Sequence, residues 1–218
     1  TSSTVVGFVY KDGIVLASDT AASYGNLAVP GVSKIYKLTD NCIVGFSGFL
    51  ADIQYLHKTV SEEIRKDPQP IDPQGIHKMI QRIVYARRSE LRLLRVAAIV
   101  CGVKKKKNEV FGSTEEAGKF IGVVNGRGNF WFDSSVATGI ASHLVLPVLR
   151  ERETKDLPRE EAVALMEDCL RLLCYKDTRA SNVVQLGFCT ADESVVMEPY
   201  ALSTNWELGR REDEAVLQ

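Results

Sequence analysis

The first part of the chain contains two strand-like runs joined by a tight turn, and this pattern limits the fold more than any other. The run from Thr4 to Tyr10 alternates β-branched or aromatic residues with others, and the run from Ile14 to Asp19 is apolar until its last two residues. Lys11-Asp12-Gly13 separates them, and a short segment ending in glycine between two such runs is typical of a β-hairpin. We therefore predict a buried hairpin on which later segments pack.

The residue at the start of the chain, Thr1, is a possible nucleophile. An N-terminal threonine can place its α-amine beside its own hydroxyl, and such an amine is one of the few bases that activate a threonine. The alternative is that Thr1 is only the position where processing left the chain. Judged from the terminus alone, the second interpretation is favoured.

Charge and hydropathy argue against two classes of partner. The chain has 27 basic and 28 acidic residues and a net charge of -1, so it has no general attraction for nucleic acid or an anionic membrane. Lys104–Lys107 resemble a nucleic-acid contact, but they lie between two strand-like runs, where a charged hairpin tip is the simpler interpretation. No apolar run approaches the roughly 18 residues of a membrane span. We expect neither a nucleic-acid partner nor a membrane partner.

The five cysteines and three histidines show no metal-ligand spacing. They are Cys42, Cys101, Cys169, Cys174 and Cys189, and His57, His77 and His143. We interpret the cysteines as reduced, buried, small apolar residues, which is typical of a cytosolic or nuclear protein. We expect no metal site and no cofactor.

The remaining chain reads as segregated runs of strands and helices. Ser23-Tyr24-Gly25-Asn26 marks a loop. Strand-like runs are 34–38, 42–46, 96–103, 120–124, 129–132, 183–190 and 194–197, and helical runs are 50–66, 72–95, 137–152 and 158–177. This order predicts an α+β layered sandwich, with antiparallel sheets flanked by helices, because parallel sheets need strict alternation of strands and helices. No linker-like segment divides it.

Several ordered motifs resemble the beta-type subunits of the proteasome core particle. They are Gly7–Asp19, Lys34-Ile35, Gly45-Phe46-Ser47-Gly48, Ala51-Asp52, Ala137-Thr138-Gly139 and Tyr175-Lys176-Asp177. The resemblance covers nearly the whole chain and implies a four-layer α/β/β/α sandwich of two antiparallel sheets, similar to the N-terminal nucleophile hydrolases. Within the family the chain is most similar to the beta-seven group of eukaryotes, which is non-catalytic.

Active members of this family need an N-terminal threonine, an acid, a lysine, an oxyanion glycine and a later aspartate. The resemblance assigns the last four to Asp19, Lys34, Gly48 and Asp177. Counting back from Asp19 by the spacing of active members reaches Ser3, so Thr1 overshoots the nucleophile position by two residues. Two residues are about 6–7 Å of extended chain, far more than near-attack geometry tolerates.

Two further departures from the active pattern support this interpretation. Ile140 and Ala180 stand where active members have serines near the amine, and the segment from Asp19 to Lys34 is one residue short. We therefore expect an inactive chain in which Ser3, Asp19, Lys34, Gly48 and Asp177 are vestigial positions. The alternative is an active threonine-type endopeptidase that uses Thr1 or, after further trimming, Ser3.

The resemblance also implies partners and a place in the cell. It implies other alpha-type and beta-type subunits in stacked seven-membered rings, within a complex that degrades proteins in ubiquitin-dependent proteolysis, in the cytoplasm and the nucleus. We expect residues 1–206 to form the domain and residues 207–218 a C-terminal assembly arm. The arm has few apolar residues but ends in Ala215-Val216-Leu217. The alternative for this segment is a frayed end.

Overall fold

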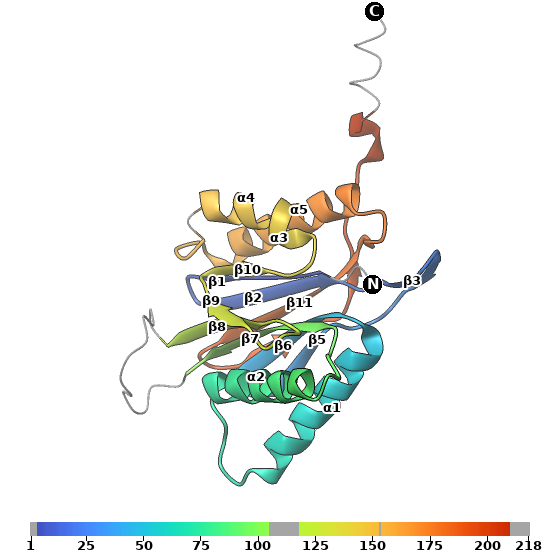
Figure 1. Cartoon of the computed structure of the whole chain (residues 1–218). Helices are drawn as coiled ribbons and strands as arrows, with labels where there is room; N and C mark the ends of the chain where they lie inside the picture. The colour runs from blue at the N-terminus through green and yellow to red at the C-terminus, as the bar shows by residue number, and fades with distance from the viewer. Residues whose placement is uncertain (1–3, 105–117, 153, 210–218) are drawn as a thin grey trace, which may run out of the picture.

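The computed structural model describes residues 4–104, 118–152 and 154–209 and contains two main β-sheets (Figure 1). The first is a six-stranded antiparallel sheet with the order β10-β1-β2-β11-β12, in which β13 also pairs with β11. Its strands are β1 (Val5–Tyr10), β2 (Gly13–Asp19), β10 (Ser135–Ala137), β11 (Val183–Thr190), β12 (Ser194–Val196) and β13 (Tyr200–Ala201). The predicted hairpin is confirmed, because β1 and β2 pair from Val5↔Ser18 to Tyr10↔Gly13.

The second sheet has five antiparallel strands in sequence order. Its strands are β5 (Ile35–Thr39), β6 (Cys42–Gly48), β7 (Val96–Val103), β8 (Lys119–Val124) and β9 (Phe130–Phe132). A separate two-stranded ribbon is formed by β3 (Ala22–Tyr24) and β4 (Leu27–Val29). The sequence predicted a loop at this position. The prediction missed the ribbon because none of its residues is buried, and a strand without a buried face has no alternating apolar pattern.

Helices cover the outer face of each sheet (Figure 1). One group, α1 (Leu50–Lys66) and α2 (Pro73–Ser89), packs on the five-stranded sheet. The other group is α3 (Ala141–Leu144), α4 (Leu146–Glu151) and α5 (Arg159–Lys176), and it packs on the six-stranded sheet. A short 3-10 helix, η1 (Trp206–Gly209), follows.

The two sheets pack face to face through a third hydrophobic cluster. It includes Val5, Ile14 and Leu16 from the first sheet and Ile43 and Ile99 from the second. Close approach requires small residues here: a Cβ atom at Gly45 of β6 would lie 2.5 Å from the Val5 side chain. Both faces of β1 and β2 are therefore buried.

The α+β class with antiparallel sheets is confirmed, but two predicted helical boundaries were wrong. The single helix expected over 137–152 begins only at Ala141 and is interrupted at Val145, where Pro147 in the next turn cannot donate a backbone hydrogen bond. Residues 135–137 form β10 instead. Helix α2 ends at Ser89, so Arg92 and Arg95 follow the helix rather than belonging to it.

Several sequence predictions fall outside the described residues. These are the nucleophile positions Thr1 and Ser3, the lysines 105–107 and most of the arm, 210–218. All five cysteines are free and buried, as predicted. Within the described ranges, no helix is long and apolar enough to cross a bilayer, and no cluster of His, Cys, Asp or Glu has a metal-binding arrangement.

We predict that Gly45→Ala lowers the free energy of unfolding by about 1–3 kcal/mol, because the added methyl group overpacks the space between the sheets. Denaturant unfolding followed by tryptophan fluorescence measures the change. Ala86→Val, on the exposed side of α2, is the control and should cost no more than the difference in helix propensity, at most about 0.7 kcal/mol. Equal effects of the two substitutions would contradict the packing argument.

Candidate active site

A buried ion pair joins two of the predicted site residues. Asp19 is the last residue of β2, and Lys34 directly precedes β5 in the facing sheet. Lys34 Nζ lies 2.7 Å from Asp19 Oδ1, and the two side chains are only 2% and 7% exposed. The second carboxylate oxygen of Asp19 accepts a hydrogen bond from the backbone N–H of Ala21. The pair therefore links the two sheets at the end where β2 finishes.

Burial and charge act in opposite directions on Lys34. Burial lowers the pKa of the Lys34 ammonium below its ordinary value, while Asp19 and then Asp177 raise it. The two carboxylates therefore favour the protonated form of the Lys34 amine, and burial opposes it. A buried amine with a lowered pKa next to a carboxylate is suited to proton transfer with a nearby hydroxyl.

Gly48 lies at the end of β6, on the strand that hydrogen-bonds to Lys34. The Phe46 N–H donates to the Lys34 carbonyl at 2.8 Å, and Gly48 is two residues farther along. Gly48 has a φ of +127°, and a Cβ atom there would lie 2.2 Å from the Arg95 carbonyl oxygen. Backbone geometry alone therefore requires glycine at this position, whether or not its N–H has a catalytic role.

Asp177 caps the C-terminal end of α5 and lies close enough to Lys34 to affect its pKa. Its side chain accepts a hydrogen bond from the Arg179 N–H, and its carbonyl accepts one from the Ala180 N–H. Ala180 is thus in the same turn as Asp177. Ile140 precedes α3 and is 40% exposed. Neither side chain offers the hydroxyl that active members have near the amine.

The structure adds one polar contact that the sequence analysis missed. Val5 N–H donates to the Thr138 hydroxyl at 3.0 Å, and Thr138 N–H donates to the Val5 carbonyl at 2.9 Å. Thr138 thereby anchors the beginning of β1 beside Asp19. The motif containing Thr138 was recognised, but a contact across 133 residues has no local sequence signal.

Ser18, next to Asp19, is fully buried, and its hydroxyl has no hydrogen-bond partner among the described residues. A polar atom in that position is costly unless something outside the described ranges pairs with it. Among the described residues, the strand ladder gives this hydroxyl no partner.

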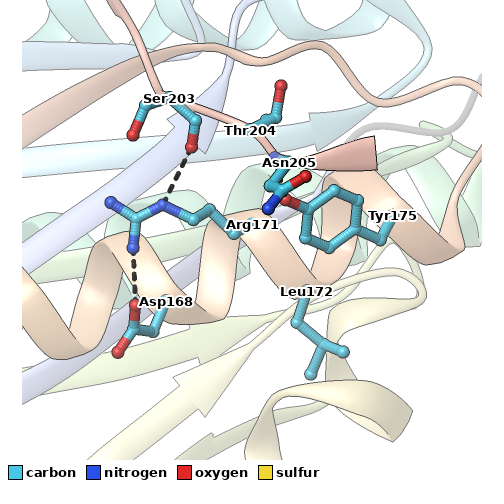
Figure 2. Close-up of a pocket in the computed structure, with 7 residues that line it drawn as sticks. All are labelled: Asp168, Arg171, Leu172, Tyr175, Ser203, Thr204 and Asn205. Atoms are coloured by element: carbon cyan, nitrogen blue, oxygen red, sulfur yellow. Dashed lines mark hydrogen bonds and ion pairs between the residues drawn. The ribbon is translucent and has the colours of Figure 1, made fainter. Parts of the chain in front are cut away.

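A separate cavity of about 500 Å³ lies between α5 and residues 203–205 (Figure 2). Figure 2 shows the Arg171 guanidinium between Asp168 and the Ser203 carbonyl, with the Tyr175 ring beside Asn205. The Tyr175 hydroxyl accepts a hydrogen bond from the Asn205 N–H at 2.7 Å. Of the predicted catalytic positions in the described ranges, Asp19, Lys34, Gly48 and Asp177, none lines this cavity.

We predict that Asp19→Asn lowers the free energy of unfolding by about 3–5 kcal/mol, because it leaves the Lys34 ammonium buried without its counter-ion. Urea unfolding measures the loss. Lys37→Gln is the matched control: its ion pair with Asp40 is exposed, so its loss should cost less than about 1 kcal/mol. The double variant Asp19→Leu/Lys34→Met should recover most of the stability, since it buries no charge.

The same pair predicts a pH dependence. Because the pKa of Lys34 is lowered in the folded state, the unfolded chain binds more protons between that value and the ordinary value of 10.5. The free energy of unfolding should therefore rise with pH across this interval more steeply in the wild type than in Asp19→Leu/Lys34→Met. Identical slopes in the two proteins would show that Lys34 has an ordinary pKa.

Comparison of the sequence with known proteins shows which family the chain resembles. The family model described as "Proteasome subunit" matches residues 1–189. The chain is 43% identical to "Probable proteasome subunit beta type-7" of Encephalitozoon cuniculi, an alignment that covers 100% of this chain and 98% of that protein. It is 32% identical to "Proteasome subunit beta type-4" of Arabidopsis thaliana, over 95% of this chain and 82% of that protein.

A further relative is "Proteasome subunit beta type-7" of Saccharomyces cerevisiae, 30% identical over 86% of this chain and 72% of that protein. The alignment with the Encephalitozoon cuniculi relative covers the whole chain, and the family model covers residues 1–189, so both include the Asp19–Lys34 pair and α5. The family match and the coverage of these relatives lead to one conclusion: the chain belongs to the proteasome subunit family.

Proposed function

We propose that this chain is a non-catalytic, structural beta-ring subunit of the proteasome core particle. The observation that carries the proposal is the register of the first hairpin. Val5, the first residue of β1, pairs with Ser18, the residue before Asp19. In sequence, Ser3 comes two residues before Val5 and Thr1 two residues before Ser3, a spacing equal to roughly 6–7 Å of fully extended chain.

The wider architecture supports this proposal. Two antiparallel sheets lie between two groups of helices (Figure 1), which agrees with a four-layer α/β/β/α sandwich of the N-terminal nucleophile hydrolase type. We propose that the chain occupies one place in stacked seven-membered rings, beside other alpha-type and beta-type subunits. Its complex would act in ubiquitin-dependent proteolysis in both the cytoplasm and the nucleus.

The retained ion pair favours a second candidate function. An active threonine-type endopeptidase would need a carboxylate and a lysine in contact, and Asp19 and Lys34 are in contact at 2.7 Å. The pair also has a structural role, because it connects β2 with the beginning of β5. We therefore favour the inactive subunit, and the nucleophile must be tested directly.

We predict that purified particles containing this chain show no covalent label on its residue 1 or residue 3 after treatment with a threonine-directed electrophile that also reacts with the α-amine. Intact-mass and peptide-mass measurements report the adduct, and N-terminal sequencing identifies the first residue. The catalytic subunits of the same particles are the positive control. An adduct on Thr1 or Ser3 would establish the active endopeptidase instead.

We also propose that residues 207–218 act as an assembly arm beyond a domain of residues 1–206. The root of the arm is held against α5: Arg171 Nε donates to the Ser203 carbonyl at 3.2 Å (Figure 2). The Trp206 ring packs edge-on against Tyr175. The Glu207 N–H donates to the Asn205 side chain. These contacts fix the chain up to the point where the proposed arm begins, and this fixed root supports the proposal.

Deletion of residues 207–218 should leave the domain folded but slow the pairing of rings, so that half-particles accumulate. Sedimentation and native electrophoresis of particles from cells that express only the truncated chain measure this. A second variant replaces residues 207–218 with a Gly/Ser segment of equal length, which keeps the length of the chain but removes the side chains that would dock. This variant should behave like the deletion. Normal amounts of complete particles with the truncated chain would mean that the segment is a frayed end.

A further inference from the structure

Strand β9 is an edge strand of the five-stranded sheet, and its three residues are exposed. It ends the strand order β5-β6-β7-β8-β9 and pairs only with β8, from Gly122↔Phe132 to Val124↔Phe130. Its other side therefore carries no strand among the described residues. Proteins that work alone protect such edges with lysine, proline or a bulge, because an open edge recruits other strands.

All three side chains of β9 are large, aromatic and exposed. Phe130, Trp131 and Phe132 are 53%, 44% and 57% exposed. Phe130 and Phe132 pack against each other and against the buried His77 of α2, with ring centroids 5.1–5.7 Å apart. Trp131 pairs with Val123, which belongs to the cluster between the sheets, so it projects from the opposite face. The edge thus presents aromatic rings on both faces.

Arginines border one end of this edge. The turn before β9 packs on α2: Gln81 donates to the Gly128 carbonyl, and Arg88 donates to the Arg127 carbonyl at 3.3 Å. The Arg88 guanidinium also lies 5.7 Å from the centre of the Tyr85 ring, and Tyr85 is 52% exposed. Neither Arg88 nor Arg127 has an ion pair with any residue in the described ranges.

At the other end of β9 the charges are already matched. Arg150 lies 3.3 Å from the Asp133 carboxylate, directly after the strand. The surface therefore has a positive end, an aromatic middle and a neutral end. Tyr, Trp and Arg are the residues that contribute most binding energy at protein interfaces.

We propose that the β9 surface, formed by Tyr85, Arg88, Arg127, Phe130, Trp131 and Phe132, binds an extended segment of a neighbouring subunit. This segment adds to β9 as a further strand and places a carboxylate beside Arg88 and Arg127. The inference rests on the proposed function, because the neighbouring subunit is the polypeptide that the particle would supply.

The chemistry of the surface favours this occupant over others. Strand addition satisfies the open backbone edge, and alternate apolar side chains of the added strand cover the rings on each face. A nucleic acid would place many phosphates along the edge, but among the described residues that form this surface, the arginines without an ion pair lie at one end. A single carboxylate at that end matches the arrangement.

Photo-crosslinking within purified particles identifies the occupant. The photoreactive residue p-benzoylphenylalanine replaces Phe132, and mass spectrometry maps the adduct. We expect one adduct, on an extended segment of a neighbouring subunit that contains Asp or Glu. The same residue in place of Lys58, on the exposed side of α1, is the control and should give a different product. An adduct on a second copy of this chain, on a substrate peptide or on nucleic acid would overturn the proposal.

Charge changes on the surface test the same proposal through assembly. Trp131→Glu and the double variant Arg88→Glu/Arg127→Glu should each lower the share of tagged chain found in complete particles by about tenfold in competition with the untagged wild type. Trp131→Phe should restore incorporation, and Lys58→Glu controls for added negative charge. If both charged variants enter complete particles as well as the wild type does, this inference is wrong and the proposed function is unaffected. Failure of the tagged wild type to enter particles would instead overturn the proposed function, and this inference with it.

Discussion

The structure depends on the close packing of two sheets across a layer built mainly of apolar side chains. Strands β1 and β2 are buried on both faces, one against the helices α3–α5 and the other against the five-stranded sheet. Glycines set the spacing: Gly45 leaves room for Val5, and Gly187 leaves room for Ile35 and Ile43. Everything that positions the candidate site, including the end of β2 and the beginning of β5, is aligned by this contact.

One charged contact lies at the end of that apolar layer. A buried ion pair seldom stabilises a fold more than apolar side chains of the same size, because both charges lose their hydration. Asp19 and Lys34 are therefore not explained by stability alone. The pair does impose geometry, since only one arrangement of β2 and the segment before β5 satisfies both charges. The inactive subunit that we propose would keep the pair for this geometry.

Much of the fold could be predicted from local pattern, but the site could not. Gly13 and the alternating runs around it were sufficient for the β1–β2 hairpin, and Asp72 with Pro73 marked the beginning of α2, where Asp72 accepts a hydrogen bond from the Gly75 N–H. The break at Val145 and the exposed β3–β4 ribbon were missed, because neither has a periodic apolar pattern. Asp19 and Lys34 were paired only through a family resemblance. The Thr138–Val5 contact depends on topology, which no local window contains.

The position of β11 has a consequence for how the chain acquires its fold. β11 pairs with β2 from Asp19↔Val184 to Gly13↔Thr190, so the centre of the six-stranded sheet is built from the two ends of the domain. During synthesis, β1 and β2 leave the ribosome before β10 and β11, so both edges of the hairpin stay open until those two strands emerge. Contacts between such distant segments form slowly, and the waiting hairpin exposes apolar surface. For most of its synthesis, the new chain therefore has an incomplete six-stranded sheet. A chaperone or an early-binding neighbour would protect the most exposed apolar surface during this period.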